Sequence, residues 1–129
     1  MRCGDSAQVE VVVRADDTAA ALGSGSLPVL GTPRLLAWCE EATCRVLEGR
    51  LSEGSTSVGT SVRLDHLAPS GVGERLVVRA EVTAVGGRRA SFAVAATDAV
   101  GRVVGRGTVE RVVVDAERFL DPLHPPAHP

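Results

Sequence analysis

Residues 32–50 read TPRLLAWCEEATCRVLEGR and carry the strongest helix signal in the chain. Thr32 is a favourable N-cap residue, Pro33 suits the first turn of a helix, and Gly49 suits its end. At about 100° per residue, one stripe of this helix is charged: Arg34, Glu41, Arg45 and Glu48. The opposite arc is apolar or small: Leu35, Leu36, Cys39, Ala42, Thr43, Val46 and Leu47. The stretch therefore predicts one amphipathic helix with a wide buried face.

The remainder of the chain predicts β-strands. A valine-rich stretch at residues 7–14 precedes the helix, and a loop of small residues at 19–25 follows that stretch. After the helix, apolar and polar residues alternate in four further stretches: 57–66, 74–85, 88–99 and 102–114. We therefore expect one strand, one long helix and then an antiparallel meander of four strands.

This order of elements predicts an α+β fold. One helix with a wide apolar face is covered by such a sheet only if the sheet curls around it, which is the hotdog arrangement of an antiparallel sheet wrapped around one long central helix. An α+β sandwich with another strand order fits the same pattern. The chain of 129 residues is long enough for one domain. We expect that domain at residues 1–121 and a flexible, Pro-rich tail at 122–129.

Composition argues against two classes of partner. The net charge is −2, the basic residues are scattered, and Trp38, Phe92 and Phe119 are the only aromatic residues. Nucleic-acid binding needs clustered positive charge or stacking platforms, so no nucleic-acid partner is expected. The apolar runs are too short to span a bilayer, and Asp5 and Glu10 interrupt any signal-peptide core. We expect a cytoplasmic protein without a membrane partner.

The cysteines and histidines predict neither a disulfide nor a metal site. The chain has three cysteines, Cys3, Cys39 and Cys44, and the last two would lie on different sides of the helix. They are interpreted as small core residues in a reducing compartment. No other His or Cys lies near His66 in the sequence, so no metal is expected there.

Glu40 and His66 are polar residues at positions predicted to face the core. Glu40 lies on the flank of the buried helical stripe, where a carboxylate is costly unless it is paired. His66 has the same parity as Val58, Val62 and Leu64, and so faces inward at the end of its strand. The alternatives are a glutamate that reaches water from the helix margin and a structural histidine.

Thr32 adds a hydroxyl at the start of the helix. Its alternative role is only to cap backbone N–H groups, but a helix N-terminus can also stabilise a developing oxyanion. A hydroxyl, a carboxylate and an imidazole that all point inward supply what acyl transfer requires, namely an attacking group, a base and a group that orients them.

Several motifs of this chain resemble those of one family. Gly31-Thr32-Pro33 is followed by Glu40, and Gly59-Thr60 is followed by His66. Later stretches, GRRASF at residues 87–92 and GTVER at 107–111, complete the pattern. In order and spacing, residues 29–119 resemble hotdog-fold acyl-CoA thioesterases, most closely the fluoroacetyl-CoA thioesterase-like branch.

The resemblance implies roles for five residues. Thr32, Glu40 and His66 would form the catalytic trio, Gly59 would approach the thioester through its backbone, and Arg111 would help to bind the substrate. It also implies a homodimer with active sites at the subunit interface, which hydrolyses an acyl-CoA thioester to a free acid and CoA. Coenzyme A is then part of the substrate, and neither a further cofactor nor a metal is expected.

The segment before the helix departs from the family pattern. Fluoroacetyl-specific members carry phenylalanines there, whereas residues 23–27 read GSGSL. We therefore expect a different or broader short acyl group. Two alternatives remain: a hotdog hydratase or dehydratase, although the nearby Asp65 has outward parity, and a hotdog protein that binds acyl-CoA or an acyl carrier without catalysis.

Overall fold

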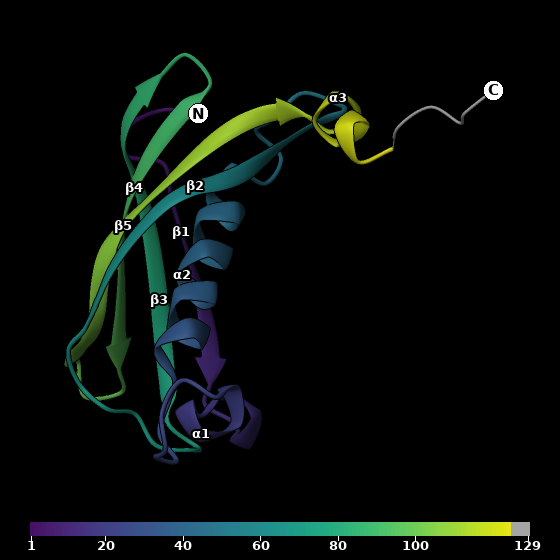
Figure 1. Ribbon diagram of the computed structural model, residues 1–129. Coiled ribbons are helices and arrows are strands. Elements are labelled where there is room, and N and C mark those ends of the chain that lie inside the picture. The colour runs from purple at the N-terminus through teal and green to yellow at the C-terminus, as the bar shows by residue number, and fades with distance from the viewer. Residues whose placement is uncertain (125–129) are drawn as a thin grey trace.

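The computed structural model describes residues 1–124 and consists of a five-stranded antiparallel sheet curled around one long helix (Figure 1). The strands are β1 (Ser6–Val12), β2 (Ser55–His66), β3 (Arg75–Gly86), β4 (Arg89–Asp98) and β5 (Val103–Asp115). The helices are α1 (Ala19–Leu22), α2 (Thr32–Leu47) and α3 (Ala116–Leu120), with short 3-10 turns η1 (Ala15–Asp17) and η2 (Asp121–Leu123). None of the helices in residues 1–124 is long and apolar enough to cross a bilayer.

The strand order is β1-β3-β4-β5-β2, which differs from the expected four-strand meander. Only β3, β4 and β5 form a meander, and β2 pairs with β5 at the far edge of the sheet. The connection at residues 67–74 is long enough to carry the chain from β2 across the open end of the sheet to β3. As a result β2 is an edge strand of the sheet.

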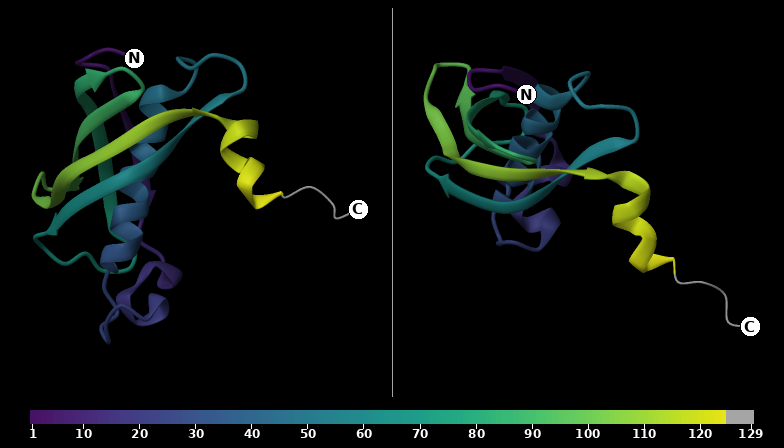
Figure 2. Two further views of the ribbon diagram at one scale, coloured as in Figure 1. Left: turned by 45° about the horizontal axis from the view of Figure 1, so that its top comes forward. Right: turned by 90° about the horizontal axis from the view of Figure 1, so that it is seen from above.

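The buried face of α2 confirms the helical pattern of the sequence. Its fully or nearly fully buried residues are Leu35, Cys39, Ala42, Thr43, Val46 and Leu47, whereas Leu36 is half-buried. They pack against inward side chains of the sheet, with Phe92 as the largest. The helix ends at Leu47, three residues before the expected end. Figure 2 shows from above how the sheet wraps around this helix.

A short helix and a turn follow the last strand. After β5 the chain forms α3, whose N-cap residue Asp115 accepts a hydrogen bond from the backbone N–H of Arg118 at 2.9 Å. Pro122 and Leu123 belong to the turn η2. The first residues of the tail predicted at 122–129 thus belong to this turn, and residues 125–129 lie outside the described part of the chain. Figure 2 shows α3 projecting away from the sheet, beyond the end of β5.

Candidate active site

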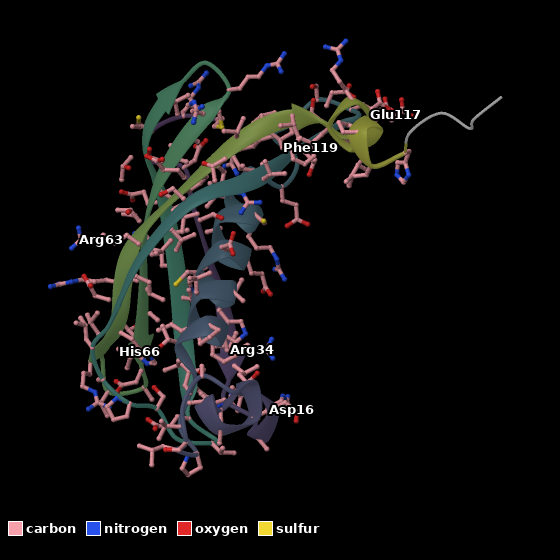
Figure 3. All side chains as sticks on the ribbon, viewed as in Figure 1. Asp16, Arg34, Arg63, His66, Glu117 and Phe119 are labelled. Carbon is pink, nitrogen blue, oxygen red and sulfur yellow. The ribbon has the colours of Figure 1, made fainter. Side chains whose placement is uncertain are left out.

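Thr32 and His66 form a hydrogen-bonded pair at one end of the domain. Thr32 is the first residue of α2 and His66 is the last residue of β2. The hydroxyl oxygen Oγ1 of Thr32 lies 2.7 Å from Nδ1 of His66. Figure 3 shows His66 at the end of the sheet that lies beside the start of α2. The inward orientation that parity predicted for His66 is therefore confirmed.

The hydroxyl of Thr32 is not used for helix capping. Gly31 is the N-cap residue, and its carbonyl accepts hydrogen bonds from the N–H groups of Arg34 and Leu35, both at 3.1 Å. Gly31 is held in extended conformation because its own N–H donates to the carbonyl of Asp17 at 2.9 Å. The expectation that Thr32 is the N-cap was wrong by one residue, and the shift leaves its hydroxyl free for His66.

The side chain of His66 is a neutral imidazole at neutral pH. Burial lowers the pKa of His66 below its ordinary value. Hydrogen bonding to the backbone of Ala68 raises the pKa by a smaller amount and so opposes this shift. Within residues 1–124, the buried Nε2 atom has no hydrogen-bond partner. A neutral imidazole with one nitrogen bonded to a hydroxyl is a competent general base.

A cavity of about 390 Å³ opens beside this pair. Thr32 and His66 line it, together with the loop before α2 and the loop after β2. The loop before α2 contributes only small or aliphatic side chains to the cavity, among them Ser24, Ser26 and Leu27. Leu27 is 63% exposed, so this loop covers the cavity only loosely.

Glu40 belongs to a second cluster, on the side of α2 that faces β2 and β5. Its Oε2 atom lies 3.5 Å from a guanidinium nitrogen of Arg111, whose side chain is only 8% exposed. Arg111 also donates to Ser57, through Nε to the hydroxyl at 2.9 Å and through a terminal nitrogen to the carbonyl at 3.1 Å. Arg111 therefore holds the Glu40 carboxylate against the inner face of the sheet, the face toward α2.

Gly59 leaves room for that carboxylate. A Cβ atom on Gly59 would lie 2.5 Å from Oε2 of Glu40, a contact that real side chains do not make. The register of β2 against β5 shifts between Gly59 and Ser61, which is a β-bulge. The absence of a side chain at Gly59 thus lets β2 pass close to the Glu40 carboxylate.

The same bulge changes which side chains of β2 face inward. Simple alternation predicted Val58 on the inner face and Ser57 on the outer face, but Ser57 bonds to the buried Arg111. One extra residue inverts the alternation, so Ser57 and Gly59 share the inner face with His66. A glycine inside a strand was the available sign of a bulge. Ser57 is the site residue that sequence reasoning missed.

The two clusters are apart within one protomer. Thr32 and Glu40 are separated by eight residues of α2, which is ~12 Å along the helix axis. The structure therefore brings Thr32 to His66 and brings Glu40 to Gly59 and Arg111, but it does not join the three residues of the expected trio within a single chain.

Within residues 1–124, the cysteines and the possible metal ligands do not form a further site. Burial raises the pKa of the Cys39 thiol to about 11, so Cys39 is not a thiolate at neutral pH. Cys3 and Cys44 are exposed, which corrects the expectation that all three cysteines are core residues. In the part of the chain that the structure describes, no three His, Cys, Asp or Glu side chains gather as metal ligands do.

Known proteins share this fold and sequence. The fluoroacetyl-CoA thioesterase of Streptantibioticus cattleyicolor is 36% identical over 91 residues, which cover 70% of this chain and 65% of that protein. The match thus spans slightly less than two thirds of the relative. A solved structure of the fluoroacetyl-CoA thioesterase FlK has a TM-score of 0.88 and 31% identity, with 98% of each chain covered.

Two further structures extend the comparison. A variant of FlK in complex with fluoroacetate and CoA has a TM-score of 0.86 and 32% identity, covering 92% of this chain and 99% of that one. A thioesterase superfamily member from Thermus thermophilus has a TM-score of 0.85 and 28% identity, covering 92% and 87%. The hotdog fold expected from the sequence is therefore confirmed. A family model described as fluoroacetyl-CoA-specific thioesterase matches residues 13–117, and the chain belongs to this family.

Proposed function

We propose that this protein hydrolyses a short-chain acyl-CoA thioester to a free acid and CoA, as a homodimer with two active sites at the subunit interface. The observation that carries the proposal is the hydrogen bond between Thr32 and His66 at the cavity beside the lid, the loop at residues 23–29. Membership of a thioesterase family supports the choice of thioester hydrolysis.

The free edge of β2 supports a dimer. This strand is 12 residues long, and its outer edge has no paired strand within residues 1–124. At the opposite edge of the sheet, β1 is only 7 residues long. A long unpaired edge strand exposes a row of backbone hydrogen-bonding groups and readily pairs with a second chain. We infer that two copies pair along β2.

One register of that pairing completes the site. In an antiparallel pair related by a two-fold axis, the numbers of opposite residues have a constant sum. An axis between Val62 and Arg63 would set His66 opposite Gly59 of the partner subunit. Thr32 and His66 of one protomer would then lie beside Glu40 of the partner subunit, because Gly59 and Glu40 are in contact within a chain.

Each residue then has a chemical role. His66 is the base that takes a proton from the attacking oxygen, which belongs to the hydroxyl of Thr32 or to a water that Thr32 and Glu40 hold. Attack forms a C–O bond at the thioester carbonyl and breaks the C–S bond. The thiolate of CoA leaves and takes the proton back from His66. If Thr32 is the attacking group, a water that His66 deprotonates then cleaves the ester on Thr32, which releases the free acid and restores the hydroxyl. Arg111 orients Glu40, and Gly59 approaches the thioester through its backbone.

The test is thiol release from a panel of acyl-CoAs by the purified protein. We expect turnover that peaks on one short acyl group and is lost in Glu40→Gln. Glutamine is preferred to alanine in this variant because it fills the same space beside the buried Arg111. Acyl-CoA binding with no release on any substrate would instead make the protein a non-catalytic binder.

The activity is expected to depend on pH through His66. Because burial keeps the pKa of His66 below its ordinary value of about 6.5, kcat/KM should be flat near neutrality. It should fall about tenfold per pH unit once the pH drops below that pKa. Acidification also lowers the free energy of unfolding, because the unfolded chain protonates His66 first. A profile measured in short assays should be unaltered in His124→Ala, and a fall in kcat/KM whose midpoint lies above 6.5 would contradict the assignment of His66 as the base.

The lid is expected to influence selectivity between acyl groups. Ser26 lines the same cavity as Thr32 and His66, so a ring at this position would contact the acyl group. Ser26→Phe should raise the ratio of kcat/KM for fluoroacetyl-CoA to that for acetyl-CoA by about tenfold, the order that one hydrophobic contact supplies. Ser26→Ala, which adds no ring, is the control. If the ratio of the two kcat/KM values were the same in Ser26→Phe and Ser26→Ala, the lid would not influence selectivity.

A cytoplasmic location completes the proposal. Its support is the absence of a membrane-spanning helix in residues 1–124 and the presence of free rather than paired cysteines, as in a reducing compartment.

A further inference from the structure

An ion pair holds the start of α2 against the turn η1. Oδ1 of Asp17, in η1, lies 2.9 Å from Nε of Arg34, in the first turn of α2. This Nε atom is buried and has no hydrogen-bond partner within residues 1–124, so the contact is an ion pair without a hydrogen bond. The other carboxylate oxygen of Asp17 accepts the backbone N–H of Arg14 at 2.8 Å. The Asp17 carboxylate, only 13% exposed, is therefore fixed to η1 and attracts Arg34 from there.

The position of Arg34 is unfavourable for the helix taken alone. The first turn of a helix carries a partial positive charge and favours acidic side chains. The first turn of α2 has no acidic residue and contains Arg34 instead. Asp17 supplies the missing negative charge from outside the helix. The ion pair therefore joins two segments of the chain instead of adding to the intrinsic stability of α2.

The same aspartate also holds the backbone next to Thr32. The carbonyl of Asp17 accepts the N–H of Gly31 at 2.9 Å, and Thr32 follows Gly31 directly. Thr32 therefore lies between two attachments to η1, one through the backbone of Gly31 and one through the side chain of Arg34. From this position its hydroxyl oxygen lies 2.7 Å from Nδ1 of His66.

We propose that Asp17 and Arg34 are positioning residues of the active site, whose ion pair fixes the first turn of α2 so that the hydroxyl of Thr32 stays within hydrogen-bond distance of His66. This inference rests on the proposed thioesterase function. In the described part of the chain, other residues line the cavity beside Thr32 and His66, so the pair acts through Thr32 and not on the substrate. In the view of Figure 3, Arg34 and His66 lie on opposite sides of the start of α2.

The experiment compares Asp17→Asn and Arg34→Met with two matched controls. Asp16→Asn makes the same change of charge at the neighbouring, exposed residue of η1. Asp5→Asn breaks a similar pair beyond the other end of α2, where Nε of Arg50 lies 3.3 Å from a carboxylate oxygen of Asp5. The first control reports the effect of charge near the site, and the second reports the effect of losing an ion pair elsewhere on the domain.

The two test variants should lose turnover without losing affinity. We expect kcat for the acyl-CoA with the highest turnover to fall about tenfold in Asp17→Asn and in Arg34→Met, because a displacement of about 1 Å can cost up to ~10²-fold in rate. The double variant should fall no further, since both substitutions break one pair. Arg34→Lys keeps the positive charge and should retain most of the turnover. KM should remain that of the controls, and both controls should keep the kcat of the unmodified protein.

The pKa of His66, followed by NMR of its ring protons, tests the inference without turnover. Asp17→Asn should raise this pKa toward its ordinary value of about 6.5, because a loosened helix start lets water reach the partly buried imidazole. Asp16→Asn should leave the pKa of His66 where it is in the unmodified protein.

The two measurements separate this inference from the proposed hydrolysis. A raised pKa of His66 in Asp17→Asn, in a protein that releases no thiol, would support the positioning pair and overturn the hydrolase. Thiol release with the same kcat in Asp17→Asn, Arg34→Met and the controls would overturn the positioning role alone. A change confined to KM would also overturn it, because the pair would then act on substrate binding.

Discussion

Replacing His66 by alanine is expected to lower kcat for acyl-CoA hydrolysis by about 10²–10⁴-fold, the range that general acid–base catalysis contributes. The imidazole bonds to the hydroxyl of Thr32 through Nδ1, and its removal leaves no base beside that hydroxyl. Thiol release under saturating substrate measures the loss.

The same variant should keep the fold and the dimer. His66 is only half-buried at the end of β2, so its removal deletes no part of the core that packs on α2. Circular dichroism and gel filtration check this point, and His124→Ala, an exposed histidine beyond η2, serves as the matched variant with retained turnover. Turnover of the unmodified protein in a folded His66→Ala dimer would rule out the proposed active site.

Mixing two inactive chains is expected to restore activity. If each site takes His66 from one protomer and Glu40 from the other, a hybrid of a His66→Ala chain and a Glu40→Gln chain carries both substitutions in one site. Its second site is intact. Such a hybrid should therefore show roughly half of the kcat of the unmodified dimer, because one of two symmetric sites works. The two parent homodimers should show almost none.

The control hybrid combines His66→Ala with Thr32→Val. Thr32 and His66 belong to the same cluster within a chain, so each site of this hybrid lacks one member and no activity should return. Co-expression with two different affinity tags isolates the hybrid dimers, and thiol release is compared with the parents. Activity in neither hybrid would show that the site is formed within one protomer, and the inferred pairing along β2 would be wrong.

Only part of the candidate site could be predicted from the sequence. The polar residues at inward positions, Glu40 and His66, were found by periodicity, because a helix and a strand each place side chains at fixed angles. Periodicity failed at Ser57, since the bulge beside Gly59 inserts one residue and inverts the alternation of β2. The capping role predicted for Thr32 also failed, because a contact between Gly31 and Asp17 shifts the helix start by one residue.

The sequence by itself determined the elements and the central helix. The local spacing of apolar residues decides which face of α2 is buried. Because that face is wide, the sheet must curl around the helix to cover it. Only the tertiary structure decided that β2 lies at the edge beside β5, and that Thr32 meets His66 while Glu40 meets Arg111. These contacts join residues that are far apart in the chain. Which residues meet depends on the path that the long connections take across the sheet, and no local pattern encodes that path.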